Sequence, residues 1–396
     1  MQENRGMRIV MVFNSFAYWW RKEAADVFNW SSLMLAALLA ERRTNFVGYV
    51  YDAMFRVWID RVFRSVFQRH KAVILTYHGF TERNTNDGVY DADKLHVTVD
   101  EFTEHIQFLK RQYTIIPLGL FVKHCMDGLP VPDKAVIITF DDGYRSTCTC
   151  AFPILQRYGV PATVFLPTDF IDRKHYLWTN RIEYALINTI VPSLTVRIKN
   201  HEEELPCRDL PSKQAAVRKV KSVLKQLPYS EIEQVVGALE DATGCSLLHT
   251  ASVPSMFEPL TWEQIGKMNA SGLVTFGSHT GSHAILTRLQ PPDITRELVC
   301  SKEIIESRLG ISCKFFSYPE GQPNAFSDLT KSLVKEAGYR GALTTIEGAN
   351  SSNDDLFTVK RYTVVAGDSR GQLAMAVCGL GQALVKLKSR LQWNSK

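Results

Sequence analysis

From residue 73 onward, short apolar runs alternate with amphipathic stretches, and this alternation restricts the chain to a few folds. Runs rich in Val, Ile, Leu and Phe predict strands at 73–77, 113–116, 135–140, 162–166, 274–277, 314–317, 342–345 and 361–365. Between them, helical periodicity predicts helices at 100–111, 151–158, 261–271, 293–309 and 327–337. Strands that alternate with helices build parallel sheets. We therefore expect an α/β fold, either a barrel or a doubly wound sheet.

The alternation is interrupted once and has an appendage at each end. The segment 171–258 is too long for an ordinary loop and contains a helical stretch at 212–239, so we interpret it as an inserted, mainly helical subdomain. Residues 1–70 are predicted to form an N-terminal helical appendage, and 371–396 a C-terminal helix. The barrel or sheet itself would then comprise 71–170 and 259–370.

Composition narrows the class of protein. The chain has 396 residues, of which 45% are hydrophobic and 22% charged, as is ordinary for a folded soluble protein. The net charge of +5 is mild and no long basic block occurs, so we expect no nucleic-acid partner. The 8 cysteines are scattered without a CxxC pair, which favours reduced thiols in a reducing compartment.

The N-terminal region shows neither a clear secretory signal nor a membrane-spanning segment. The apolar run 33–40 is far shorter than the ~20 residues that cross a bilayer. Aromatic residues and arginines interleave over 46–70, a pattern compatible with a helix lying on an anionic membrane. The alternative, which we favour, is a helix packed on its own domain. The expected location is cytoplasmic, with peripheral contact at the inner face of the membrane as a second option.

Side chains that can perform chemistry gather at predicted strand ends. Asp141 and Asp142 directly follow one apolar run, and His279 and His283 lie just past another. Barrels place their catalytic groups at such strand ends. Two neutral imidazoles and one carboxylate form a ligand set that suits zinc or another divalent transition metal, and a second carboxylate could accept a proton from water. Each motif alone also has a plain structural interpretation, as a turn or as a helix face.

Together the two motifs resemble those of one enzyme family. Residues 139–143 match TFDDG, and 279–283 match the His-(Ser/Thr)-x-x-His motif, of the polysaccharide deacetylases with a NodB-homology domain, carbohydrate esterase family 4. The resemblance covers roughly 71–170 and 255–368. It implies a distorted (β/α) barrel of the NodB-homology type.

The resemblance also implies roles for individual residues. Asp141 would be the general base, and Asp142, His279 and His283 would bind one divalent metal ion. Zinc is the preferred ion, with cobalt, nickel, manganese and iron as alternatives.

The sequence departs from the commonest family pattern in its catalytic acid. No histidine follows His283, whereas the family's acid histidine usually comes late in the chain. The segment Leu-Thr-Tyr-His-Gly at 75–79 resembles a branch of the family in which this histidine precedes TFDDG. His78 therefore inherits the role of catalytic acid.

A second departure concerns the arginine that orients the base. Ser-Tyr-Pro-Glu-Gly at 317–321 stands where the family has Arg-x-Pro-Tyr-Gly, so the motif arginine is missing. Arg361 and Arg145 are the two candidates to replace it. Further candidates for the oxyanion or substrate loop are, in order along the chain, Trp178, Tyr318 and Glu320.

The resulting hypothesis is a metal-dependent hydrolase of carbon–nitrogen bonds other than peptide bonds. It would remove N-acetyl groups from an amino-sugar-containing glycan or oligosaccharide and release acetate. One alternative is a related amide hydrolase, such as a lipid-linked sugar deformylase or a small cyclic amide hydrolase. Another is a catalytically silent carbohydrate-binding protein, which the complete set of candidate catalytic and metal-binding residues argues against.

Overall fold

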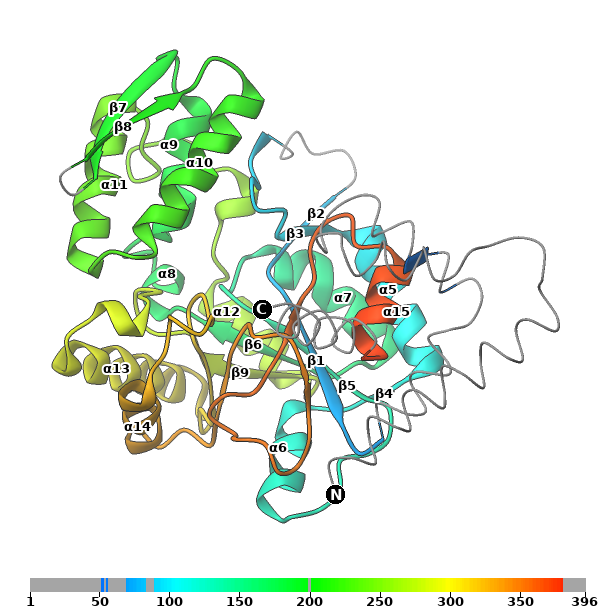
Figure 1. Ribbon diagram of the computed structural model, residues 1–396. Helices are drawn as coiled ribbons and strands as arrows, with labels where there is room; N and C mark the ends of the chain where they lie inside the picture. The colour runs from blue at the N-terminus through cyan, green and yellow to red at the C-terminus, as the bar shows by residue number, and fades with distance from the viewer. Residues whose placement is uncertain (1–50, 53–54, 56–68, 83–88, 199–200, 380–396) are drawn as a thin grey trace, which may run out of the picture.

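The protein is built around a mixed, strongly curled sheet, seen in the computed structural model of Figure 1. The structure describes residues 51–52, 55, 69–82, 89–198 and 201–379. Within them, the sheet has 9 strands in the order β11-β10-β9-β6-β5-β1-β12, with β13 beside β1 and β4 beside β5. The strands are β1 (Ala72–Tyr77), β4 (Thr114–Ile115), β5 (Ala135–Phe140), β6 (Ala162–Leu166), β9 (Val274–Ser278), β10 (Phe315–Ser317), β11 (Gly341–Leu343), β12 (Ala349–Asn350) and β13 (Tyr362–Thr363).

The segment around β13 connects β11, at one end of this sheet, with β1 near the other end. The backbone N–H of Val359 donates to the carbonyl of Ala342 in β11, and that of Val364 donates to the carbonyl of Thr76 in β1. β13 also pairs in parallel with β1, whereas β12 pairs with β1 antiparallel. The sheet thus curls into a distorted barrel, which confirms the α/β class and the barrel expected from the sequence.

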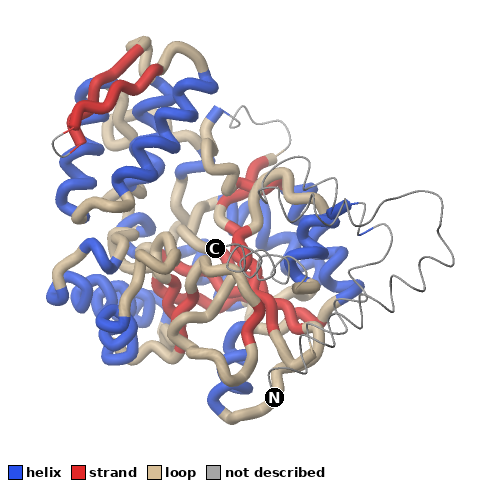
Figure 2. Tube along the Cα trace, viewed as in Figure 1, coloured by secondary structure: helices blue, strands red, loops and turns tan. Residues whose placement is uncertain are grey.

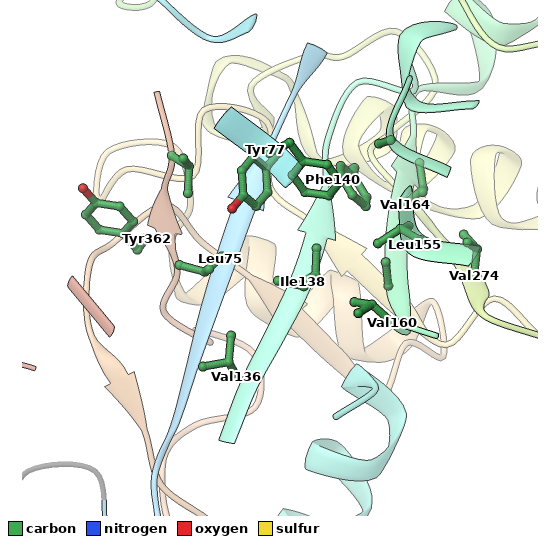
Figure 3. Packing of buried hydrophobic residues seen from close by; sticks show 14 of the residues in the cluster. Leu75, Tyr77, Val136, Ile138, Phe140, Leu155, Val160, Val164, Val274 and Tyr362 are labelled. Carbon is green, nitrogen blue, oxygen red and sulfur yellow. The ribbon is translucent and has the colours of Figure 1, made fainter. Parts of the chain in front are cut away.

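The central strands are apolar throughout because both of their faces are covered. All six residues of β1 and all six of β5 are buried. Alternate side chains, such as Leu75 and Ile138, point toward the surrounding helices, and Figure 3 shows them packed in one cluster with Leu155 and Val164. Parallel strands buried on both faces read as continuous apolar runs rather than alternating ones.

Helices flank the curled sheet and begin where capping residues allow. They are α5 (Val99–Gln112), α6 (Leu118–Met126), α7 (Phe152–Tyr158), α12 (Trp262–Ala270), α13 (Pro291–Leu309), α14 (Asp328–Glu336) and α15 (Arg370–Val377). Thr98 caps α5 in a reciprocal arrangement with Glu101, and Gly310 ends α13 in a left-handed conformation. Each predicted helix of the alternating region has a counterpart within a few residues.

The segment after β6 departs from the alternation, as the sequence indicates. It contains α8 (Thr168–Ile171), α9 (Trp178–Asn188), β7 (Ser193–Ile198), β8 (His201–Pro206), α10 (Leu210–Leu224) and α11 (Tyr229–Thr243). Figure 2 shows the β7–β8 hairpin lying against the helices, in a lobe beside the sheet. The helical stretch expected at 212–239 is two helices, because Pro228 separates them. The hairpin was not predicted.

The two predicted appendages fall mostly outside the described residues. This applies to nearly all of 1–70, including the stretch 46–70, and to the C-terminal helix beyond α15 and residue 379. Across the part of the chain that the structure describes, no helix is long and apolar enough to span a membrane.

Candidate metal and catalytic site

The backbone bends sharply at each predicted metal ligand loop. Asp142 has φ 70°, and Thr280 and His283 have φ 67° and 60°, all in the left-handed region that side chains other than glycine rarely adopt. Gly143 also has φ 65°, and a Cβ there would approach Leu166 to 2.9 Å. Such strained positions concentrate at functional sites, where surrounding contacts hold them.

These turns bring Asp142, His279 and His283 together. Their ligand atoms all lie within 4.8 Å of one another, and all three residues are buried. Asp142 Oδ1 is 3.6 Å from His279 Nε2 and 3.3 Å from His283 Nε2. This carboxylate oxygen has no well-aligned hydrogen-bond donor among the described residues. A buried anionic oxygen flanked by two imidazole nitrogens is a donor set for a divalent transition metal.

The hydrogen bond of His279 supports the same conclusion. Its Nδ1 lies 2.7 Å from the carbonyl oxygen of Ser317, which can only accept, so Nδ1 carries the proton. The lone pair of Nε2 then faces Asp142, as in metal-binding histidines whose other nitrogen is held by a carbonyl. Burial lowers the pKa of His279 to about 4, so its ring is neutral at physiological pH.

The remaining two ligands form a charge pair in the absence of metal. Burial would raise the pKa of Asp142, but the close approach and charge of His283, with the charges of His78 and His279, lower it overall. Burial would lower the pKa of His283, yet the close approach and charge of Asp142 raise it. A bound cation would take the place of the His283 proton.

Asp141 is held separately by Arg361. The guanidinium donates in bidentate fashion, with Nη1 2.8 Å from Oδ1 and Nη2 2.7 Å from Oδ2. Arg361 is fully buried and Asp141 is 2% exposed. Burial acts to raise the pKa of Asp141, but the charge and hydrogen bond of Arg361, together with the charges of His279 and His78, outweigh it, so the net pKa is lowered and the carboxylate is ionised.

Several neighbours fix Arg361 in this orientation. Its Nε donates to the carbonyl of Thr344, and its Nη1 also reaches the hydroxyl of Thr76 at 3.0 Å. Nη2 donates to the Ser317 hydroxyl at 2.8 Å, which itself lies 3.3 Å from Asp141 Oδ2. Arg361 thus has a partner for each side of its planar guanidinium.

Glu297 of α13 holds the histidine loop and was missed by the sequence analysis. Its carboxylate accepts hydrogen bonds from the backbone N–H groups of Gly281 at 2.7 Å and Ser282 at 3.0 Å, and from the Ser282 hydroxyl at 2.8 Å. It therefore fixes the loop between His279 and His283. Nothing in its local sequence distinguishes it from the other acidic residues of an amphipathic helix.

His78 lies beside the two aspartates. It directly follows β1, next to the end of β5, and its charge contributes to the lowered pKa of both Asp141 and Asp142. Its Nδ1 is buried and has no hydrogen-bond partner among the described residues. The structure therefore brings together His78, both aspartates, both histidines and Arg361.

Two further candidates, Trp178 and Tyr318, have buried side chains. Trp178 is 1% exposed and belongs to the apolar core of the inserted segment. Tyr318 is fully buried, its hydroxyl donates to Phe357, and its backbone N–H donates to Leu343, so it offers neither a ring face nor an oxyanion donor.

Two charged candidates are engaged in ion pairs. Arg145 forms an ion pair with Glu258, and the ion pair with Asp141 is formed by Arg361. Glu320 has φ 63° and pairs with Lys225 of the inserted segment at 2.7 Å. Its charge is among those that raise the pKa of His283, so it lies at the edge of the site.

Comparison with known proteins identifies the family. Residues 128–342, more than half of the chain, match the family profile described as Polysaccharide deacetylase. This chain belongs to the polysaccharide deacetylase family. The expected enzyme class, a hydrolase of carbon–nitrogen bonds other than peptide bonds, is thereby confirmed.

Individual relatives are distant. The chain is 23% identical over 301 residues to YxkH of Bacillus subtilis, covering 76% of this chain and 73% of that protein. It is 31% identical over 147 residues to the poly-beta-1,6-N-acetyl-D-glucosamine N-deacetylase of Staphylococcus epidermidis, covering 35% of this chain and 50% of that protein. For the enzyme of the same name from Escherichia coli K12, identity is 29% over 136 residues, covering 33% of this chain and 18% of that protein. The chain thus matches half or less of each N-deacetylase.

Two solved structures share the fold. Streptococcus pyogenes deacetylase PplD, in complex with acetate, superposes with a TM-score of 0.52 at 18% identity and covers 78% of this chain and 98% of its own. IcaB from Ammonifex degensii gives a TM-score of 0.51 at 18% identity, covering 78% and 97%.

Proposed function

We propose that this polysaccharide deacetylase is a metal-dependent N-deacetylase that releases acetate from an N-acetylglucosamine-containing glycan. The observation that carries the proposal is the buried Asp142, His279 and His283 set beside Asp141, whose charge Arg361 maintains. The names of the Staphylococcus epidermidis and Escherichia coli relatives, both N-deacetylases of poly-beta-1,6-N-acetyl-D-glucosamine, support the substrate class.

Asp142, His279 and His283 would hold the metal ion. Their two nitrogens and one carboxylate oxygen favour zinc, which takes such mixed sets and retains positions for water. When bound, the ion would polarise the acetamide carbonyl and lower the pKa of an attacking water.

Asp141 would remove the proton from that water. It is ionised and lies outside the metal set, and Arg361 fixes both carboxylate oxygens in place. A base held in this way needs little reorientation as the water attacks the carbonyl carbon.

His78 would donate a proton to the departing amine, as in the branch of the family whose acid histidine precedes TFDDG. An amide nitrogen leaves poorly as an anion, so this step requires an acid near the scissile bond. His78 lies beside Asp141 and Asp142, with Nδ1 free of partners in the described part of the chain.

The test is product release by the zinc-loaded protein from a panel of N-acetylated glycans, including β-1,6-linked and β-1,4-linked N-acetylglucosamine oligomers. We expect stoichiometric acetate and free amine, abolished by chelation and restored by zinc. Asp141→Asn with full zinc content is the matched inactive control. Release of formate from an N-formylated sugar, with no acetate from any glycan, would support the deformylase alternative instead. Glycan binding without either product would indicate a carbohydrate-binding protein.

A further inference from the structure

We infer that His96, Tyr144 and Asn180 form a polar recess that binds one hydroxyl of the sugar carrying the acetamide. This inference rests on the proposed function and adds a specificity determinant to the same site. These three residues come from separate parts of the chain: the start of the short strand β3 (His96–Thr98), the loop after Asp142, and α9 of the inserted segment.

The position of His96 follows from a short strand pair next to His78. β2 (Gly79–Thr81) and β3 (His96–Thr98) are parallel, with Gly79 opposite His96. The imidazole of His96 lies against Gly79 so closely that a Cβ there would come within 2.3 Å of the ring. His96 is 7% exposed, and the charges of His78 and Asp142 both act on it. Its ring is therefore beside the residues proposed to protonate the amine and hold the metal.

Tyr144 connects this imidazole with the inserted segment. It comes two residues after Asp142, and its ring centroid lies 5.1 Å from that of His96. The Tyr144 hydroxyl donates to Asn180 Oδ1 at 3.0 Å, and Asn180 is 4% exposed. The hydrogen bond orients the amide of Asn180 at the side of the site.

Two of these buried groups have hydrogen-bonding capacity left over. His96 Nδ1 and Asn180 Nδ2 have no partner among the described residues, and the same holds for His78 Nδ1 nearby. Buried polar groups are normally paired, so several such atoms in one place indicate a polar ligand. Burial lowers the pKa of His96 to about 3, and the neutral ring has one donor and one acceptor nitrogen. A sugar hydroxyl both donates and accepts, which suits a neutral imidazole and an amide N–H together.

The experiment measures glycan binding to zinc-loaded Asp141→Asn protein, which binds without turnover. Affinities are compared for N-acetylglucosamine oligomers and for their 3-deoxy and 6-deoxy forms. We expect the protein to prefer the parent oligomer over one deoxy form by about five- to tenfold, the worth of one buried hydrogen bond. His96→Phe, which keeps a planar ring, should bind both forms equally because it removes the hydrogen-bonding nitrogens. His105→Phe, a change at another buried histidine on α5, is the control and should retain the preference.

If the His96→Phe protein has normal zinc content and still prefers the parent oligomer over the deoxy form to the same extent, the inference is overturned. The recess would then bind no sugar hydroxyl. If His96→Phe does not fold, Asn180→Leu provides the same comparison from α9 and should reduce the preference. The proposed function fails separately if wild-type protein neither binds nor deacetylates any N-acetylated glycan, and the inference fails with it. Acetate release by wild type together with unchanged discrimination in both variants overturns the inference alone.

Discussion

Adjacent residues with identical side chains have different surroundings at this site. Asp141 and Asp142 are both buried with lowered pKa values, yet Asp141 faces a permanent cation and Asp142 faces two imidazoles. Arg361 keeps the Asp141 carboxylate charged without a metal. A metal ion would complete the surroundings of Asp142 and the two imidazoles. This difference supports the proposed roles of Asp141 as the base and Asp142 as a metal ligand.

Replacement of His279 or His283 by Ala should remove bound zinc and activity together, because each removes one of three protein ligands. Asp141→Asn should retain zinc and lose turnover by at least about 10²-fold, since only the base is lost. Metal analysis of each purified variant, paired with acetate release, makes the comparison. A metal-free Asp141→Asn protein would mean that the roles of the two aspartates are exchanged.

His78→Ala should retain zinc and glycan binding while kcat falls by about 10²- to 10⁴-fold, as expected for loss of a positioned acid. The loss should be smaller for an activated ester, whose leaving group departs without a proton. Rates on an amide and on an aryl acetate provide the measurement. Equal loss on both substrates would argue for a structural role.

Arg361→Ala should destabilise the fold by about 3–5 kcal/mol, because it leaves the Asp141 charge buried and unpaired. Adding Asp141→Asn should recover part of that free energy of unfolding, since no charge then remains to be matched. Chemical denaturation of the wild type and the three variants forms a double-mutant cycle. Strict additivity of the two changes would contradict the interaction.

At the scale of elements, the position of a loop depends on the helix behind it. Glu297 on α13 accepts three hydrogen bonds from the loop that carries both histidines. The loop has left-handed backbone at Thr280 and His283, which favours relaxation once those bonds are lost.

Glu297→Gln should therefore lower zinc affinity by about 10- to 100-fold, the usual effect of altering groups that support metal ligands. Competition with a chromophoric chelator measures the affinity. Glu303→Gln, on the same helix, is the matched control and should bind zinc like the wild type. Unchanged affinity in Glu297→Gln would show that the backbone alone holds the loop.

The same scale explains which elements the sequence could predict. The barrel strands are continuous apolar runs, so their pattern survives without tertiary information. β8 (His201–Pro206) is acidic and largely exposed, and resembles a loop until β7 pairs with it. The exposure of Trp178 and Tyr318 depends on packing from distant segments, and no local pattern reports it.

At the scale of the molecule, the inserted segment contacts both loops of the site. Tyr229 at the start of α11 donates to the carbonyl of Ser282 at 3.3 Å, and Lys225 pairs with Glu320. Arg288, past the histidine loop, donates back to the Lys225 carbonyl at 3.0 Å. The inserted segment is thus mechanically connected to the loop that carries both histidines.

The metal-free protein should lose stability as the pH falls. His279 has a pKa near 4 when folded and 6.5 as an unperturbed group, so the unfolded chain gains a proton first and stability decreases from about pH 6.5 down to 4. Asp141 has a lowered pKa, so its contribution is present above about pH 4 and is lost below it. The pKa of His283 is raised in the folded protein, so this residue has the opposite effect. Its contribution to stability is lost as the pH rises through that raised pKa.

Urea unfolding of chelated protein between pH 4.5 and 8 measures the first effect. His279→Gln should flatten the decline, because no group at that position then titrates. An equally steep decline in this variant would assign it to other residues. Zinc should also reduce the pH dependence above pH 6.5 by replacing the His283 proton.

Arg361 lies 220 residues after the carboxylate that it neutralises, in the segment that closes the barrel. During synthesis, Asp141 is therefore made long before its partner exists, and the pair forms only once β13 has joined β1. Contacts so distant in sequence form late and slowly. A nascent or truncated chain lacking this segment has both aspartates but no means to bury the first one, so competence for hydrolysis coincides with completion of the barrel.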